Sequence, residues 1–268
     1  MKKGTYVYCL VAAARRPSLA RLPAGPSGLA RPRLVDLPGT VFRHANRSLS
    51  AWLVVADAPL DKYGEEAINR GLSDLDWVAR TAVAHEAVIE SFVAAAAVLP
   101  MKLFTIFASD DRAREHIGRE RRLDAVVERV ANHQEWGVRV VLDRAGAQSA
   151  AHGSARSRKA AQPLSGQSFL LRKKAERDAS AELARRAQET TLDFYERLST
   201  FAREAKRRAA GELPVEGGPL LLDAAFLVAA KKSARFREEV GRQAQALGRY
   251  GYHVTLTGPW PPYSFVQD

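Results

Sequence analysis

The order of strand-like and helix-like stretches in the second half of this sequence limits its fold more than any other feature. These stretches alternate between the two-residue period of strands and the three-to-four-residue period of helices. They lie at 135–142, 168–208, 220–229, 233–248 and 252–256. We interpret the order from residue 135 onward as strand, long helix, strand, strand, helix, strand, in which one of the two middle strands is not assigned to a stretch. This is the split-βαβ, ferredoxin-like pattern. The sequence therefore predicts an α+β protein whose C-terminal domain, 133–268, is ferredoxin-like with an extended first helix.

The first part of the chain, 1–132, predicts a separate and looser α+β domain. Its apolar run at 6–14 could be a short secretory signal or a first strand. We favour the strand, because the run is short, contains two tyrosines and alternates as strands do. Residues 15–39, rich in Pro, Gly and Arg, form a long connection. The other predicted elements are strands at 40–43 and 51–56, a helix N-capped by Ser73 and running to about Ala97, a strand after Pro100, and a connecting helix at 110–132.

The charge of the chain is high and uneven. The net charge is +11, and residues 156–208 contain 14 Lys and Arg against 7 Asp and Glu, a net charge of +7. Such a segment suits an acidic partner, which could be nucleic acid, an anionic membrane surface or an acidic protein surface. The single cysteine, Cys9, excludes an internal disulfide and fits a reducing cytoplasm. No apolar run reaches membrane-spanning length, so we expect no membrane insertion.

The predicted long helix is a charged rod with one apolar seam, preceded by a flexible loop at 144–163. Forty-odd residues at about 1.5 Å each make it roughly 60 Å long, which is more than a small sheet can cover. Part of it should therefore project as a docking surface. A solvated charged face is the simpler explanation for any single cation. The candidate partner-binding cations are Arg172, Lys173, Lys174, Arg185 and Arg186.

The chain ends in a proline-rich, aromatic tail, LTGPWPPYSFV at 256–266. Its three prolines fix φ and remove backbone donors, which predicts a stiff, extended arm. Exposed aromatic side chains at a chain end are costly, so the tail should pack onto the protein, as a cap on a sheet edge, or onto a partner. If it packs in the core, Trp260→Ala should cost about 3 kcal/mol or more. The candidate partner-binding residues of the tail are Trp260, Tyr263 and Phe265.

His85 and Glu86 form the one adjacent pair that suggests acid–base chemistry. A histidine beside a carboxylate can be a general base, but the spacing brings no nucleophile or second base to it. His85 also lies on the apolar stripe of its predicted helix, so we interpret it as a buried histidine satisfied by hydrogen bonds. The sequence has no P-loop, G-x-G-x-x-G, H-E-x-x-H or G-x-S-x-G pattern. It predicts no catalytic, metal-binding or cofactor-binding residue.

Six stretches, in order, resemble the gas vesicle protein F/L (GvpF/GvpL) family. They are the opening strand, HEAVIE with VLPMKLFTIF within 85–107, EWGVRVVL at 135–142, FLLRKKAE at 169–176, AAFLV at 224–228 and the ending GPWPPYSFV. One position departs from the family pattern, which has Arg, Phe and Gly where this chain has Lys102, Leu103 and Phe104. Phe104 removes the close backbone approach that a glycine permits.

The resemblance implies a function without catalysis, cofactor or small-molecule substrate. Family members are accessory proteins with two α+β domains that act early in the assembly of gas vesicles, the hollow protein-walled organelles that give buoyancy. The implied partners are the small, hydrophobic shell protein and other gas vesicle accessory proteins, and the implied location is the cytoplasm and the gas vesicle. A factor that holds such a shell subunit needs an open sheet edge or an amphipathic groove.

Nucleic-acid binding is the alternative function, because a basic split-βαβ domain invites an RNA-recognition interpretation. That fold binds bases with aromatic residues on its two central strands. Here Trp136 and Phe226 are the only aromatics on those strands, and the Lys/Arg-Gly-aromatic motif is missing. A protein partner is therefore preferred over nucleic acid.

Overall fold

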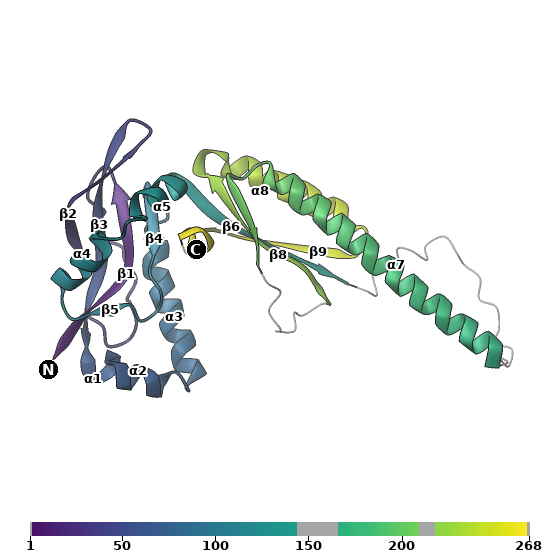
Figure 1. Cartoon of the computed structure of the whole chain (residues 1–268), viewed down its shortest axis with the longest axis horizontal. Coiled ribbons are helices and arrows are strands. Elements are labelled where there is room, and N and C mark those ends of the chain that lie inside the picture. Colours follow the sequence, from purple (N-terminus) through teal and green to yellow (C-terminus); the bar gives the residue numbers. More distant parts are fainter. Residues whose placement is uncertain (1, 144–165, 209–217, 267–268) are drawn as a thin grey trace. The chain divides into compact units, whose positions relative to one another are not determined.

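The structure is a computed structural model that describes residues 2–143, 166–208 and 218–266 (Figure 1). The chain forms two compact units, one of Met1–Glu135 with Pro259–Asp268 and one of Trp136–Gly258. Each unit has one sheet with helices, so the mixed α and β character expected from the sequence is confirmed. The proline-rich tail belongs to the first unit, whereas the sequence analysis grouped it with the second. The loop predicted at 144–163 lies outside the described residues.

The sheet of the first unit is built around β1. Its strands lie in the order β2-β3-β1-β4, and β5 pairs with the first half of β1. Residues 6–12 of β1 are fully buried. Because successive side chains point to opposite faces, both faces of the sheet are covered at this strand. The strands are β1 (Lys3–Ala13), β2 (Arg33–His44), β3 (Arg47–Pro59), β4 (Ala97–Pro100) and β5 (Ile106–Phe107).

Helices cover the apolar side chains of the sheet in the first unit. Helix α3 packs Val88 and Ile89 against Tyr6 and Tyr8 of β1, as its helical spacing of apolar residues predicts. Helices α4 and α5 contact β2, and α9 of the tail contacts α5 and β4. The helices are α1 (Leu60–Tyr63), α2 (Glu65–Gly71), α3 (Leu75–Glu90), α4 (Asp110–Gly118), α5 (Leu123–Val130) and α9 (Tyr263–Val266).

Several predicted boundaries in this unit were wrong. Strands β2 and β3 are longer than expected, and β2 begins at Arg33, inside the connection predicted at 15–39. Asp74, not Ser73, caps α3 by accepting a hydrogen bond from the backbone N–H of Trp77. The connecting helix predicted at 110–132 is two helices, α4 and α5. The interruption falls at 119–122, Arg-Glu-Arg-Arg, which offers no apolar side chain to pack against the sheet.

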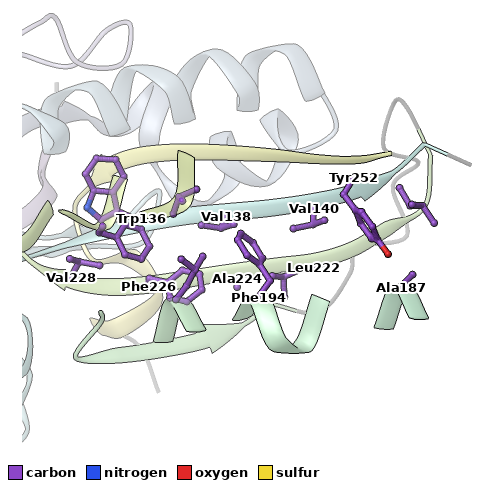
Figure 2. Packing of buried hydrophobic residues seen from close by; sticks show 14 residues of the cluster. Trp136, Val138, Val140, Ala187, Phe194, Leu222, Ala224, Phe226, Val228 and Tyr252 are labelled. Carbon is purple, nitrogen blue, oxygen red and sulfur yellow. The ribbon is translucent and has the colours of Figure 1, made fainter. Parts of the chain in front are cut away.

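The sheet of the second unit has helices on one face. Its strands lie in the order β7-β8-β6-β9, and along the chain they alternate with helices as β6-α7-β7-β8-α8-β9. Side chains from α7 and α8 meet alternate residues of β6 and β8 in one apolar core (Figure 2). The elements are β6 (His133–Leu142), α7 (Gly166–Ser199), β7 (Glu204–Arg207), β8 (Leu220–Ala229), α8 (Ser233–Gly248) and β9 (Tyr252–Trp260), with a 3-10 turn η1 (Ala230–Lys232).

The long helix is shorter than the predicted 168–208. It ends at Ser199, and residues 204–207 form β7, which pairs antiparallel with β8 from Glu204 opposite Leu227 to Arg207 opposite Ala224. Hydrogen bonding to β8 overrides the helical spacing of Phe201 and Ala205, whose side chains still pack against the core. At about 1.5 Å per residue, the 34 residues of α7 make a rod about 51 Å long.

Candidate functional site

Only the second half of α7 is anchored to the sheet. Ala187, Phe194 and Leu198 lie in the apolar core, where Figure 2 shows Phe194 among the side chains of β6 and β8. At the C-terminal end, Arg197 Nε donates to Glu239 Oε1 of α8 at 2.7 Å. Glu239 is buried and also accepts from Gln243 and pairs with Arg242. This half of the helix is therefore fixed by packing and by a buried carboxylate.

The first half of α7 extends past the strands of its sheet (Figure 1). Every described side chain at 169–181 is exposed. Phe169, Leu170 and Leu171 are 44%, 68% and 64% exposed, which is unusual for three successive large apolar residues. The expected projecting surface is therefore present, and it combines apolar and basic side chains.

The five candidate cations of α7 fall into two groups. Arg185 and Arg186 pair with Glu182 one turn away, and Arg185 also reaches Glu189 at 2.6 Å. Hydrogen bonds from Arg185 and Arg186 lower the pKa of Glu182 to about 2. Arg172 lies 5.8 Å from the centre of the Phe169 ring.

Lys173 and Lys174 form no ion pair with any described residue. They lie near the N-terminus of α7, whose first turn has no acidic residue. Lys173 and Lys174 are the eighth and ninth residues of α7, past the first turn to which the effect of the helix dipole is confined.

The tail packs back onto the first unit. This is one of the two outcomes that the sequence predicted, packing onto the protein or onto a partner. Phe265 is fully buried, and Tyr263 packs against the core of β1 and α3. The buried carboxylate of Glu135 accepts from Ser264 twice, from the backbone N–H at 2.7 Å and from Oγ at 2.8 Å. Trp260 is only half-buried, at the end of β9.

The tail is extended, as its prolines suggested, only as far as Trp260. It begins as β9, an edge strand, where Pro259 is tolerated because no neighbour is needed on its outer side. It ends in the short helix α9, in which the backbone N–H of Ser264 donates to Glu135. Glu135 belongs to the Glu-Trp-Gly stretch, so two separate sequence motifs meet here.

His85 is a buried structural residue, as predicted. It is 3% exposed, and both ring nitrogens have partners: Nδ1 lies 2.8 Å from the Tyr6 hydroxyl and Nε2 lies 3.2 Å from the carbonyl oxygen of Met101. Since a carbonyl can only accept, Nε2 donates and Nδ1 accepts from Tyr6. Burial lowers the pKa of His85, which keeps the ring neutral.

Phe104, three residues after Met101, has a strained backbone conformation. Its φ is 64°, in the left-handed region that glycine adopts without cost. Its ring stacks on Trp77 of α3, with centroids 5.2 Å apart and an angle of 9° between the planes. The backbone thus adopts a conformation that favours glycine, while the side chain gains an aromatic contact.

A groove of about 450 Å³ lies beside Phe104, and sequence reasoning missed it. Its apolar wall combines α1, α2 and β5, and Glu65 and Asn69 supply polar groups. The signal that could have identified it is the acidic run at 60–76, with five acidic and two basic residues in a basic chain. The apolar lining residues are Leu60, Tyr63, Ile68, Phe104, Ile106 and Phe107.

The sheet face that α7 and α8 leave open carries no aromatic from the central strands. Trp136 and Phe226 both point into the apolar core under the helices. On the other face, Asp223 pairs with Arg139 at 3.0 Å and Arg208 at 3.2 Å. This face lacks the stacking groups with which RNA-recognition sheets bind bases.

Metal-ligand clusters and membrane-spanning helices are both absent from the described part of the chain. No cluster of three or more His, Cys, Asp or Glu side chains there could hold a metal ion. No helix in the described ranges is long and apolar enough to span a membrane.

Comparison with known proteins gives a consistent result. The family model for "Gas vesicle synthesis protein GvpL/GvpF" matches residues 4–267. Gas vesicle protein L of Streptomyces sp. (strain CB03234) is 31% identical over 265 residues, covering 97% of this chain and 92% of that protein.

Solved structures show the same fold at lower identity. The crystal structure of GvpF from Anabaena sp. PCC7120 is 15% identical, with a TM-score of 0.67 and 99% of both chains covered. GvpF from Microcystis aeruginosa is 14% identical, with a TM-score of 0.62, and the match covers 98% of this chain and 99% of that one. The chain belongs to the GvpL/GvpF family of gas vesicle synthesis proteins.

Proposed function

We propose that this gas vesicle accessory protein acts in vesicle assembly by binding the hydrophobic shell protein and other accessory proteins. The projecting half of α7 is the surface that supports this proposal best. It presents Leu170 and Leu171 to solvent beside Lys173 and Lys174. An exposed apolar patch bordered by charge is typical of a protein-binding surface.

The architecture supports this role. We propose that residues from β6 to β9 form a split-βαβ, ferredoxin-like domain, because the element order β6-α7-β7-β8-α8-β9 and the strand order β7-β8-β6-β9 both fit that pattern. We further propose two domains meeting near residue 133. A sheet anchors one half of α7 and presents the other half, so the projecting half can bind a partner without disturbing the core.

The other candidate residues differ in how they would contribute to partner binding. Arg185 and Arg186 already have carboxylate partners, so they add charge to the surface. Phe265 and Tyr263 contribute through the fold of the first unit, whereas half-buried Trp260 on the edge strand β9 is available for contact. We propose a location in the cytoplasm and at the gas vesicle, without membrane insertion, catalysis or cofactor.

The experiment is a pull-down of the shell protein by the full chain. We expect capture by the wild type and at least tenfold weaker capture by Leu170→Ser/Leu171→Ser, which removes exposed apolar surface without touching the core. Leu192→Ser, at another exposed apolar position of α7, is the matched control. In cells, normal vesicles after a clean deletion of the gene would contradict the proposal.

Nucleic-acid binding remains the second candidate, because the segment at 156–208 has a net charge of +7. Trp136 and Phe226 point into the apolar core, so only the positive charge of this segment favours nucleic-acid binding. Charge-driven binding falls steeply with salt, so a gel-shift assay at physiological and raised salt tests it. Absence of a shift at micromolar protein excludes this function.

A further inference from the structure

Two exposed surfaces of this chain are apolar and oppositely charged. The first is the helix tip, residues 169–177 of α7. The second is the acidic groove, the pocket beside Phe104 whose lining includes Glu65. Asp61 and Glu66 of α1 and α2 are sequence neighbours of its lining residues Leu60 and Glu65. These surfaces lie in different units of the chain.

The helix tip has a net charge of +3, from four cations and one acidic residue. Phe169, Leu170 and Leu171 are successive residues, so their side chains point in three directions around the helix. One flat partner face cannot cover all three at once. A concave site that encloses the end of the helix can.

The acidic groove has the complementary properties. Ile68, Phe104 and Ile106 are half-buried along a cavity of about 450 Å³, a size that accommodates apolar side chains. Residues 60–76 have a net charge of −3 in a chain whose total is +11. Asp61, Glu65 and Glu66 are exposed and form no ion pair with a described residue.

We propose that the helix tip of one copy of this protein docks into the acidic groove of a second copy. This inference rests on the docking role proposed above for α7 and names a partner for it. Lys173 and Lys174 approach Glu65 and Glu66, and the apolar residues of the tip enter the groove. Glu65 and Glu66 thereby supply the carboxylate partners that Lys173 and Lys174 lack among the described residues.

A second copy is a suitable partner because each chain carries both the basic helix tip and the acidic groove. The two surfaces differ, so the contact is heterologous. In a pair, one copy keeps a free groove and the other keeps a free tip, so association continues into rings or filaments. One helix end in one groove is smaller than the about 1,200 Å² that stable interfaces bury, so we expect micromolar affinity.

Charge reversal on each surface tests the proposal with the full chain. Sedimentation velocity over about 1–300 µM should show wild-type species beyond a dimer. Lys173→Glu/Lys174→Glu and Glu65→Lys/Glu66→Lys should each weaken association about tenfold, because like charges then face each other. Mixing the two variants should restore it, since the acidic tip of one meets the basic groove of the other. Lys231→Glu/Lys232→Glu, an exposed pair changed by the same charge, should behave as wild type.

Cross-linking gives the position of the contact. Cys9 is buried, so Leu171→Cys and Ile68→Cys introduce the only reactive thiols of their chains. A mixture of the two variants should form a disulfide-linked dimer on mild oxidation, whereas Lys232→Cys mixed with Ile68→Cys should not.

Three results would overturn the inference: a monomer at every concentration, association that neither charge reversal changes, or no cross-link between positions 171 and 68. A monomer that still captures the shell protein would overturn this inference alone. A chain that self-associates but captures no gas vesicle protein would overturn the proposed function instead.

Discussion

Phe104 shows how one residue can carry strain and a gain in packing at the same position. A bulky residue at a φ of 64° costs about 1–2 kcal/mol relative to glycine. The stacked Trp77 ring and the wall of the acidic groove offset this cost. The hydrogen-bonded His85 holds the carbonyl of Met101 three residues earlier, which fixes the turn in place.

Two substitutions of Phe104 separate these effects. Phe104→Ala should destabilise the protein by about 1–2 kcal/mol, because it removes a half-buried ring and keeps the strained φ. Phe104→Gly loses the same ring but relieves the strain, so it should be about 1 kcal/mol more stable than Phe104→Ala. Urea denaturation of both variants measures the difference. Equal stability would mean that the backbone at this position stores no strain.

At the scale of elements, α7 and α8 depend on one buried carboxylate. Glu239 accepts from Arg197 of α7 and Gln243 of α8, while its arginine partners remain exposed. Glu239→Gln keeps the shape but weakens the charged hydrogen bonds, so we expect a loss of about 1–2 kcal/mol. Thermal denaturation monitored by circular dichroism checks this. The exposed neighbour Glu238→Gln is the control and should change the melting temperature little.

The tail is the second element whose contribution can be measured. Phe265→Ala should cost about 3–5 kcal/mol, because the side chain is fully buried. Trp260→Ala should cost about 1–2 kcal/mol, less than the sequence suggested, because Trp260 is half-buried. Chemical denaturation of the two variants gives the order. A larger loss for Trp260→Ala would contradict the structure's placement of these rings.

Element types were more predictable than element ends. The opening strand, the helix of His85 and the anchored half of α7 followed from period alone, because each buries one long apolar pattern. The end of α7 at Ser199 could not be predicted from the period, because residues 204–207 are a strand only through pairing with β8. The break between α4 and α5 and the helix α9 likewise depend on partners far away in sequence, among them Glu135.

The candidate site was predictable in the same uneven way. Projection of α7 followed from its length, and the basic residues were visible in the sequence. Which cations are paired was not, because it depends on side-chain geometry around Glu182. The acidic groove joins α1, α2 and β5, elements too short to give a periodic signal.

At the scale of the whole molecule, acid stability should follow one ion-pair network in the first unit. Arg33 of β2 pairs with Asp57 of β3 at 2.8 Å and with Asp110 of α4 at 2.6 Å. Hydrogen bonds from Arg33 lower the pKa of both carboxyl groups. A lowered pKa stabilises the fold above the ordinary value near 4, and this stabilisation is lost as pH falls through the lowered pKa.

The midpoint of urea unfolding should therefore drop as pH is lowered from 5 to about 3. Asp110→Asn should lower the midpoint at pH 7 and make the dependence on pH flatter. Asp111→Asn, whose side chain is 87% exposed, should leave the profile unchanged. An Asp110→Asn profile parallel to the wild type would show that Arg33 does not stabilise the ionised carboxyl group.

The Glu135–Ser264 contact has a consequence for biosynthesis. The ribosome makes residues 1–135 long before residues 259–266, yet both stretches belong to one core. Until its last segment emerges, the nascent first unit leaves apolar side chains near β4 and α5 uncovered. The whole inserted unit must therefore be translated before the first unit can close.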